Sequence, residues 1–316
     1  MDAIGGYFEL ELRKGEHYHK DALRLNTARN CFEYILLARK YKKVYIPYYT
    51  CEVMLQPLHK YHIGYEFYSI DMNLEPQDLI SLNDNEAFLY TNYFGLKQHC
   101  VERLASVYKS QLIVDNAQAF YAPRIKGIDT FYSPRKFFGV ADGGYLYTDC
   151  SLNQEFPIDK SYERMKHLLV RIDEDAESGY EFFRSADDGL DNQPIRIMSK
   201  LTSRILESVD YVSVRTKRRD NFMLMHEYLG EDNLLNISLC ENSVPMVYPF
   251  YTSNTELREY LIEQKVYVAK YWPNILQWCK CSDIEYSLCN GILPLPIDQR
   301  YGKKCMERII ELIKKI

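Results

Sequence analysis

The chain has 316 residues and a formal net charge of −5, with 47% hydrophobic and 26% charged residues. A chain of this length can bury a large core, and we expect two domains. The acidic balance leaves no basic field for a nucleic-acid partner. No apolar run is long enough to span a bilayer, and the first six residues lack the basic and apolar regions of a signal peptide. We therefore expect a cytoplasmic protein with no membrane partner.

In the first half of the chain, short apolar runs alternate with helical patterns. Helices are expected over 27–40 and 100–109. Short apolar runs bounded by turn residues are typical of buried strands; they cover 44–46, 67–70, 87–90, 112–114, 130–132 and 145–147. This alternation predicts the α/β class with a mainly parallel, buried sheet. In such sheets, ligands bind beyond the carboxyl ends of the strands.

The second half of the chain has a different pattern. Apolar residues recur at helical spacing between about Ile195 and Leu229, which predicts one long helix, and we interpret the basic run 215–219 within it as a solvated face. After it, strands are expected over 244–251 and 291–297, and helices over 255–264 and 302–315. These elements predict a large domain over 20–200 and a small α+β domain over 201–316, with residues 1–19 packing on the small domain.

The most informative stretch lies between Val114 and Thr148. Asp115 directly follows an apolar strand, and Gln118 comes three residues later. Ser133 and Lys136 then form an S-x-x-K turn, which is followed by the pair Gly143-Gly144. An acid, a hydroxyl and an amine at the ends of neighbouring strands are what a pyridoxal phosphate (PLP) site needs.

The chemistry of this cofactor explains each residue type. A lysine attacks the cofactor aldehyde as a free amine to form a Schiff base, and a partly desolvated, cation-rich pocket lowers a lysine pKa toward that state. A carboxylate keeps the pyridine nitrogen protonated, and hydroxyl and backbone N–H donors bind the phosphate. Lys136, Asp115 and Ser133 are the candidates for these roles. Each pattern alone recurs by chance, and it is their order that supports the site.

At this point the segment resembles the DegT-type sugar aminotransferases (DegT/DnrJ/StrS), which are fold-type-I PLP-dependent enzymes. That family has a D-x-A-Q strand end, then a serine and lysine turn, then a Gly-Gly strand. Further segments are similar to its phosphate-binding helix start, two of its strand ends and its terminal strand; they lie at Leu25 to Asn30, Ile46 to Thr50, Asn92 to Gly95 and Leu293 to Ile297.

The resemblance implies a large PLP-binding domain with a seven-stranded type of sheet, a small α+β domain and a homodimer with shared active sites. It also implies an amino acid donor, commonly glutamate, and a keto sugar nucleotide as acceptor, in surface polysaccharide or amino-sugar biosynthesis. Lys136 and Asp115 would be catalytic. The other implied cofactor contacts are the backbone of Ala28, Arg29 and Asn30, the side chains of Gln118 and Ser133, the pocket-wall candidates Tyr49 and Tyr93, and Asn192.

The chain departs from the family in several places. The family's G-x-N-Y-R-M segment, which sends an Asn to the neighbouring subunit's cofactor phosphate, is replaced by the sequence from Asp191 to Met198, where Asn192 is the candidate. The polar stretch from Phe182 to Gln193 is expected to be irregular and to complete the partner's site. Arg29 and Asn30 replace smaller residues, the lysine turn is two residues shorter than the commonest form, and the acceptor sugar stays open.

Other classes of function are alternatives to this one. Penicillin-binding proteins share S-x-x-K but need a K-T-G strand, and NAD enzymes need G-x-G-x-x-G; the chain has neither. A sugar dehydratase of the same fold replaces the lysine by histidine, so Lys136 argues against it. A non-enzymatic sensor or scaffold stays open. Of nine cysteines, the close set Cys279, Cys281 and Cys289 leaves a zinc site as an alternative to reduced thiols, although we expect no metal.

Overall fold

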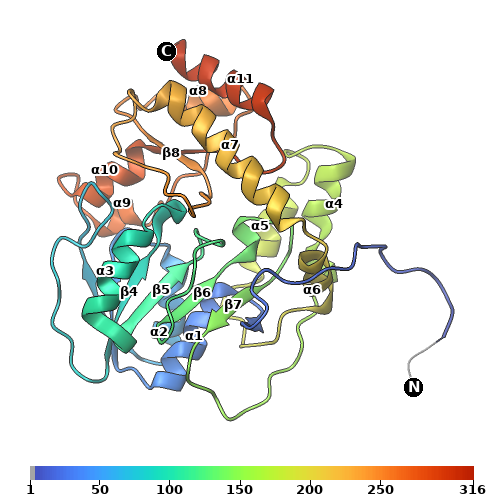
Figure 1. Cartoon of the computed structure of the whole chain (residues 1–316), viewed down its shortest axis with the longest axis vertical. Coiled ribbons are helices and arrows are strands. Elements are labelled where there is room, and N and C mark those ends of the chain that lie inside the picture. The colour runs from blue at the N-terminus through green and yellow to red at the C-terminus, as the bar shows by residue number, and fades with distance from the viewer. Residues whose placement is uncertain (1–3) are drawn as a thin grey trace.

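A computed structural model of the chain describes residues 4–316 and is built around a seven-stranded sheet of order β1-β7-β6-β5-β4-β2-β3 (Figure 1). Five adjacent strands run parallel to one another, namely β6, β5, β4, β2 and β3. Strand β7 runs antiparallel to both of its neighbours, β6 and β1. The strands are β1 (Leu23–Leu25), β2 (Lys43–Pro47), β3 (Gly64–Tyr68), β4 (Glu86–Thr91), β5 (Leu112–Asn116), β6 (Asp129–Tyr132) and β7 (Gly144–Tyr147). The predicted α/β class and mainly parallel sheet are confirmed.

Helices cover both faces of this sheet because successive strand residues point to opposite sides and both sets are apolar. One face packs against α1 (Ala28–Arg39) and α2 (Gln56–Lys60), and its core includes Ile35, Ile113 and Phe131. The other face packs against α3 (Gln98–Tyr108) and includes Phe88, Leu104 and Val114. The carboxyl ends of the parallel strands therefore lie along one edge of the sheet, and helices cover the sheet on both faces.

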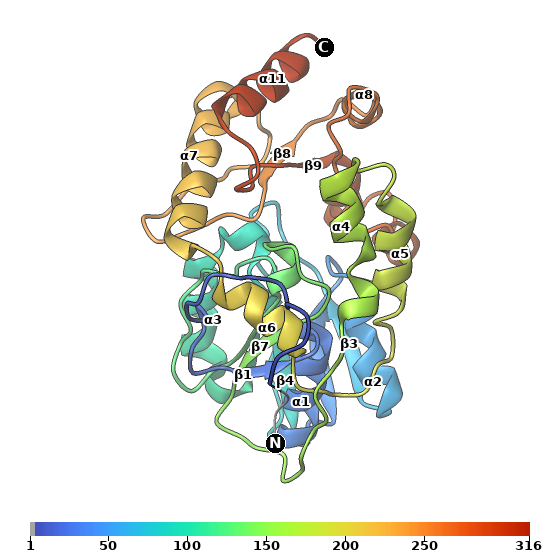
Figure 2. The ribbon, with the colours of Figure 1, turned by 90° about the vertical axis from the view of Figure 1, so that its right-hand side faces the viewer.

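A second body carries its own core above the sheet (Figure 2). Its two-stranded antiparallel sheet consists of β8 (Tyr248–Tyr251) and β9 (Ile292–Leu295). Phe222 and Met225 of a long helix pack there with Leu261 and Ile309. The remaining helices are α4 (Lys166–Asp173), α5 (Tyr180–Asp188), α6 (Lys200–Glu207), α7 (Tyr211–Leu229), α8 (Leu257–Glu263), α9 (Ile275–Trp278), α10 (Ile284–Gly291) and α11 (Lys303–Lys314).

The single helix predicted between about Ile195 and Leu229 is wrong, because the structure divides it into α6 and α7. Ser199 begins α6 by accepting a hydrogen bond from the Thr202 amide, and Asp210 begins α7 by accepting one from the Ser213 amide at 3.0 Å. Serine and aspartate are strong N-cap residues, and here a cap in the middle of the apolar pattern starts a second helix.

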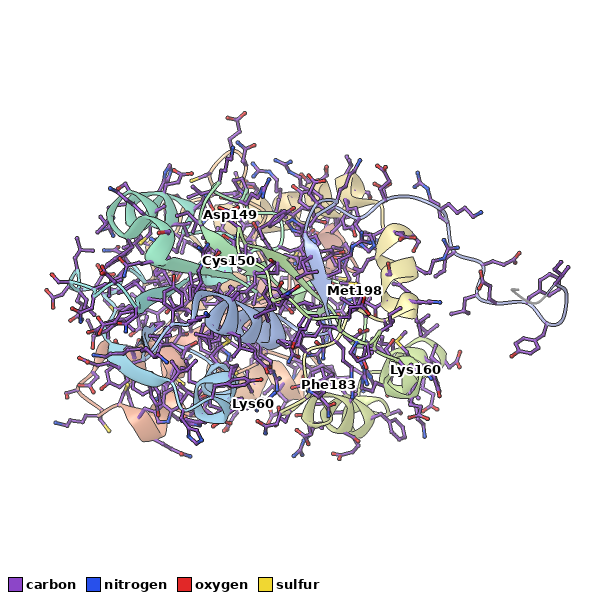
Figure 3. The ribbon with its side chains drawn as sticks, turned by 90° about the horizontal axis from the view of Figure 1, so that it is seen from below. Lys60, Asp149, Cys150, Lys160, Phe183 and Met198 are labelled. Carbon is purple, nitrogen blue, oxygen red and sulfur yellow. The ribbon has the colours of Figure 1, made fainter. Side chains whose placement is uncertain are left out.

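The N-terminal segment is predicted to pack on the small domain over 201–316, and its described part contacts both that range and the large sheet. His17 contacts the Tyr145 hydroxyl of β7 at 2.6 Å and the Ser203 hydroxyl of α6 at 2.9 Å, and His19 donates to the Phe120 carbonyl at 2.8 Å. Before His17 the chain extends away from the body (Figure 3), and Phe8 is 92% exposed. Residues 1–3 of the predicted segment lie outside the described residues.

Within residues 4–316, no helix combines the length and apolar character that crossing a membrane requires.

Candidate active site

Asp115 lies at the carboxyl end of β5 and is 5% exposed. One of its carboxylate oxygens accepts a hydrogen bond from the Ala117 amide at 2.8 Å. Among residues 4–316, no arginine, lysine or histidine forms an ion pair with this carboxylate. A buried acid without a cation is costly in its charged form.

Burial raises the pKa of Asp115 to about 6, while the Ala117 amide, the Lys136 charge and the Thr91 hydroxyl each lower it. Thr91 is the register partner of Asp115 on β4. Its hydroxyl is buried and makes no hydrogen bond of regular geometry. A protonated ring nitrogen placed against this acid would supply the cation that the Asp115 carboxylate lacks and a further hydrogen-bond donor to it. Asp115 therefore fits the pyridine end of PLP.

The turn with Ser133 and Lys136 follows the neighbouring strand β6, which pairs with β5 in parallel. Ser133 directly precedes the one-turn helix Pro134–Lys136, and its hydroxyl makes no hydrogen bond to another described residue. Lys136 is exposed, in contrast to the partly desolvated pocket expected from the sequence. Both side chains are thus available for a ligand at the strand ends.

The start of α1 offers backbone donors beside this turn. Thr27 is the N-cap, and its hydroxyl oxygen accepts from the Asn30 amide at 3.0 Å. The Asn30 N–H is therefore occupied, whereas the N–H groups of Ala28 and Arg29 belong to the first helical turn and have no partner within the helix. Of the three predicted backbone donors, two remain free for an anion.

The pair Gly143-Gly144 allows β7 to pass close to both elements. A Cβ on Gly144 would lie 2.6 Å from the carbonyl carbon of Thr27, and one on Gly143 would lie 2.9 Å from Cγ of Pro134. Gly143 also has a φ of +118°, a backbone angle that residues with a side chain rarely adopt. The glycines bring the helix start and the lysine turn together.

The side chain of Arg29 holds a loop of its own chain. Its guanidinium donates to the Gln56 side chain at 3.0 Å and to the Leu190 carbonyl at 3.3 Å, and it forms an ion pair with Asp191. The backbone N–H of Asn192 donates to the same Gln56 oxygen at 3.2 Å. Arg29 and Asn192 therefore lie close together at this edge of the site, tied by Gln56.

The aromatic candidates Tyr49 and Tyr93 are both 0% exposed, and the Tyr93 hydroxyl donates to the Tyr49 carbonyl at 2.9 Å. Neither ring offers surface to a ligand in this structure. Gln118 is 2% exposed, and its side-chain oxygen accepts from the Phe94 amide at 2.9 Å. It fixes the turn after β4, close to the end of the strand that carries Thr91.

The segment from Phe182 to Gln193 was expected to be irregular, and its first part instead belongs to α5. Asp187 of this helix pairs with Arg135 at 2.6 Å. Although Asp187 is partly buried, the charges of Arg135, Lys136 and Arg29 hold its pKa below the usual value. No local pattern connects residues 52 positions apart, so this contact cannot be predicted from the sequence.

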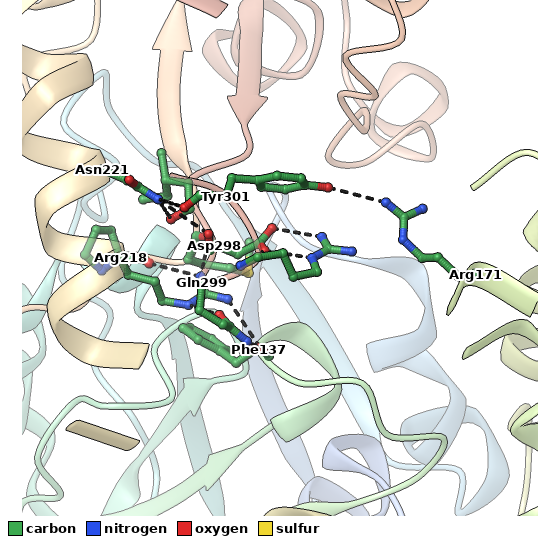
Figure 4. Close-up of polar contacts among 11 residues, drawn as sticks. Phe137, Arg171, Arg218, Asn221, Asp298, Gln299 and Tyr301 are labelled. Carbon is green, nitrogen blue, oxygen red and sulfur yellow. Dashed lines mark hydrogen bonds and ion pairs between the residues drawn. The ribbon is translucent and has the colours of Figure 1, made fainter. Parts of the chain in front are cut away.

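The lysine turn is held from the second body by Arg218 of α7 (Figure 4). This fully buried guanidinium stacks on the Phe137 ring at 4.5 Å and donates to the Met246 carbonyl at 2.8 Å. It also donates to Gln299 at 3.0 Å, whose amide donates to the Phe137 carbonyl at 2.7 Å. Burial lowers the pKa of Arg218 to about 10. The residue after Lys136 is thus anchored across the two bodies.

Two surface hollows lie beside α3, and none of the candidate site residues lines either of them. Within residues 4–316, no three His, Cys, Asp or Glu side chains are grouped to hold a metal ion. Of the zinc alternative, Cys289 is buried and its thiol donates to the Trp272 carbonyl at 3.2 Å, while Cys281 is exposed. The site is therefore recognised by the chemistry of its side chains rather than by a metal or a deep hollow.

No model of a protein family and no curated protein matches the sequence. The fold does match solved structures, each with 93% of this chain covered. NtdA from Bacillus subtilis with bound cofactor PMP aligns at a TM-score of 0.64 with 16% identity over 73% of its own chain. Sugar aminotransferase CalS13 from Micromonospora echinospora aligns at 0.62 with 11% identity over 87% of its chain. A DegT DnrJ EryC1 StrS aminotransferase from Brucella abortus aligns at 0.59 with 14% identity over 85% of its chain.

At these identities the likeness shows the fold. It confirms the predicted fold-type-I architecture and, at the level of the fold, the predicted resemblance to the DegT-type sugar aminotransferases.

Proposed function

We propose that this chain is a PLP-dependent aminotransferase that moves an amino group from an amino acid, glutamate in the first instance, to a keto sugar carried on a nucleotide. The observation that carries the proposal is the buried carboxylate of Asp115 without a cationic partner, on the strand next to the Ser133–Lys136 turn. Solved structures with this fold include sugar aminotransferase CalS13 and NtdA with bound cofactor PMP, which supports the same reaction class.

When bound, PLP supplies an electron sink for the bonds at the amino-bearing carbon of the substrate. Asp115 would hold the proton on the pyridine nitrogen. The Ser133 hydroxyl and the Ala28 and Arg29 amides would bind the phosphate at the positive end of α1. Lys136 would attach the cofactor through Nζ and, once the amino acid displaces it, would move the proton at that carbon as general base and acid.

A homodimer belongs to the proposal, and the α4–α5 hairpin supports it. The hairpin exposes apolar side chains that a monomer would leave in water, among them Ile172 at 81%, Leu169 at 53% and Phe183 at 45%. Asn192 follows this hairpin, and we propose that its side chain reaches the partner's cofactor phosphate. Production of amino sugars for surface polysaccharides is the role that we propose for the reaction.

The function is tested by incubating the protein with PLP, glutamate and a panel of keto sugar nucleotides, and by measuring the amino sugar and the keto acid by mass spectrometry. We expect both products in equal amounts, and neither with Lys136→Ala. A product that has lost water without gaining nitrogen would indicate a dehydratase. A protein that remains colourless with PLP would indicate a sensor or scaffold.

A further inference from the structure

One segment of the C-terminal half contacts β8 of the second body and also lies across the carboxyl edge of the large sheet. It includes α9 and α10, which Figure 1 places between the large sheet and the C-terminal helices. The Asn274 side chain donates to the Thr50 carbonyl at 3.0 Å, and Glu285 accepts from the Ile70 amide at 2.8 Å. Ile275 and Leu288 belong to the core of the large sheet. The segment is therefore a fixed part of the site's surroundings.

Tyr271 is the residue of this segment that approaches the lysine. Its ring centroid lies 6.0 Å from Nζ of Lys136. The Tyr271 ring also lies near-parallel to the Phe94 ring, with 6.4 Å between centroids and an interplanar angle of 29°. Tyr271 is only partly buried. Tyr271 therefore combines a position close to the Lys136 amine with partial exposure of the residue.

The neighbouring aromatic rings are less suited to contact a ligand next to Lys136. Tyr49, Tyr93 and Phe94 are each 0% exposed, so a ligand over Lys136 would find none of their faces. Trp272, next in the chain, packs edge-on against Tyr49 with centroids 5.3 Å apart. A planar, electron-poor ring held between an acid and a lysine is stabilised by an aromatic face, and offset or tilted ring pairs contribute about 0.5–1.5 kcal/mol.

We propose that Tyr271 is a cofactor-contacting residue that covers the ring of PLP, supplied by the C-terminal half of the same chain. This inference rests on the proposed function and goes beyond it, because it makes the segment around α9 and α10 a wall of the active site. Desolvation raises the pKa of Tyr271 above the ordinary tyrosine value, so its hydroxyl stays protonated near neutral pH. A ring at this place would hold the cofactor and tune its absorbance.

The test is a PLP titration of the full-length protein, followed by absorbance, with three variants. Tyr271→Leu keeps apolar bulk and removes the ring, and Tyr271→Phe keeps the ring. Tyr267→Leu is the control, because Tyr267 is 46% exposed in the same segment and donates to Glu177 instead. We expect Tyr271→Leu to weaken PLP binding about three- to tenfold and to shift the absorption band. Tyr271→Phe and Tyr267→Leu should both match the wild type.

The outcomes separate this inference from the function on which it rests. If the wild type binds PLP and Tyr271→Leu binds it with the same affinity and the same band, the role of Tyr271 is wrong and the aminotransferase proposal stands. A lower melting temperature with an unchanged band would assign Tyr271 to packing alone and also overturn it. A wild type that binds no PLP would overturn both.

Discussion

At the scale of single residues, the burial of Asp115 has a cost in stability that follows from the structure. Its folded-state pKa is about 6, against 3.8 for an ordinary aspartate, so the folded, cofactor-free protein holds the proton more tightly than the unfolded chain. Unfolding free energy therefore falls as pH rises from about 4 to about 6, and the loss persists above that range. The acid is kept at the expense of stability, as expected for a group that awaits a cationic partner.

Asp115→Asn should reverse this effect. The amide keeps an oxygen for the Ala117 N–H and removes the charge, so the cofactor-free variant should be more stable than wild type by about 1–3 kcal/mol at pH 8. The gain should vanish near pH 4, where the wild-type acid is protonated. Urea unfolding at both pH values measures the difference. Turnover should fall on the order of a thousandfold or more, because the pyridine proton is no longer held. Equal stability at pH 8, or near-normal turnover, would contradict the role of Asp115.

At the scale of elements, the lysine turn depends on α7. Arg218 donates to main-chain carbonyls and to Gln299 from a fully buried position, so its removal leaves buried acceptors without donors. Arg218→Met should lower the free energy of unfolding by about 2–4 kcal/mol. Lys217→Met, one residue earlier and exposed on the same helix, should change it by less than about 0.5 kcal/mol. Both values come from urea denaturation, and a similar effect of the two substitutions would show that the Arg218 contacts contribute nothing specific.

The same scale shows where sequence reasoning works. The expected strands at 112–114, 130–132 and 145–147 match β5, β6 and β7 closely, because buried strands are short apolar runs with turn residues on either side. The position of Asp115 and of the Ser133–Lys136 turn follows from those strand ends. The helix predicted over 302–315 matches α11, since its apolar positions repeat every three or four residues.

The errors have long-range causes. β1 has only three residues, and it is a strand because β7 pairs with it across the sheet, so no local pattern marks it. Tyr49 and Tyr93 sit at strand ends as predicted but are sealed by neighbouring rings. Tyr271 lies 135 positions from Lys136, and only the folded chain brings the two together. The strand ends that carry the candidate residues could be predicted from the sequence, whereas the long-range contacts around them could not.

For the whole molecule, we predict a dimer at twice the chain mass of 37.4 kDa. Ile172→Asp would place a charge on the exposed apolar side of α4 and should shift the protein toward the monomer, as measured by light scattering. Val212→Asp is the matched control, because Val212 is 77% exposed on α7, away from that hairpin in sequence. A wild type that is monomeric and fully active would contradict the dimer.

Mixed chains test whether the partner completes each site. Lys136→Ala and Asn192→Asp chains should each be inactive alone, and mixing them should restore up to about a quarter of the activity through hybrid dimers with one intact site. Asp tolerates the φ of +51° at position 192, so the second variant should fold. Full activity of Asn192→Asp alone would remove Asn192 from the shared site.

The central claim is that Lys136 carries PLP, and the attachment site can be measured directly. The protein is loaded with PLP, reduced with borohydride, digested and mapped by mass spectrometry. We predict one pyridoxyl group on the peptide that contains Lys136, and its loss when excess glutamate is added before reduction. The absence of label from Lys136, or equal labelling of the Lys136→Ala chain, would contradict the account.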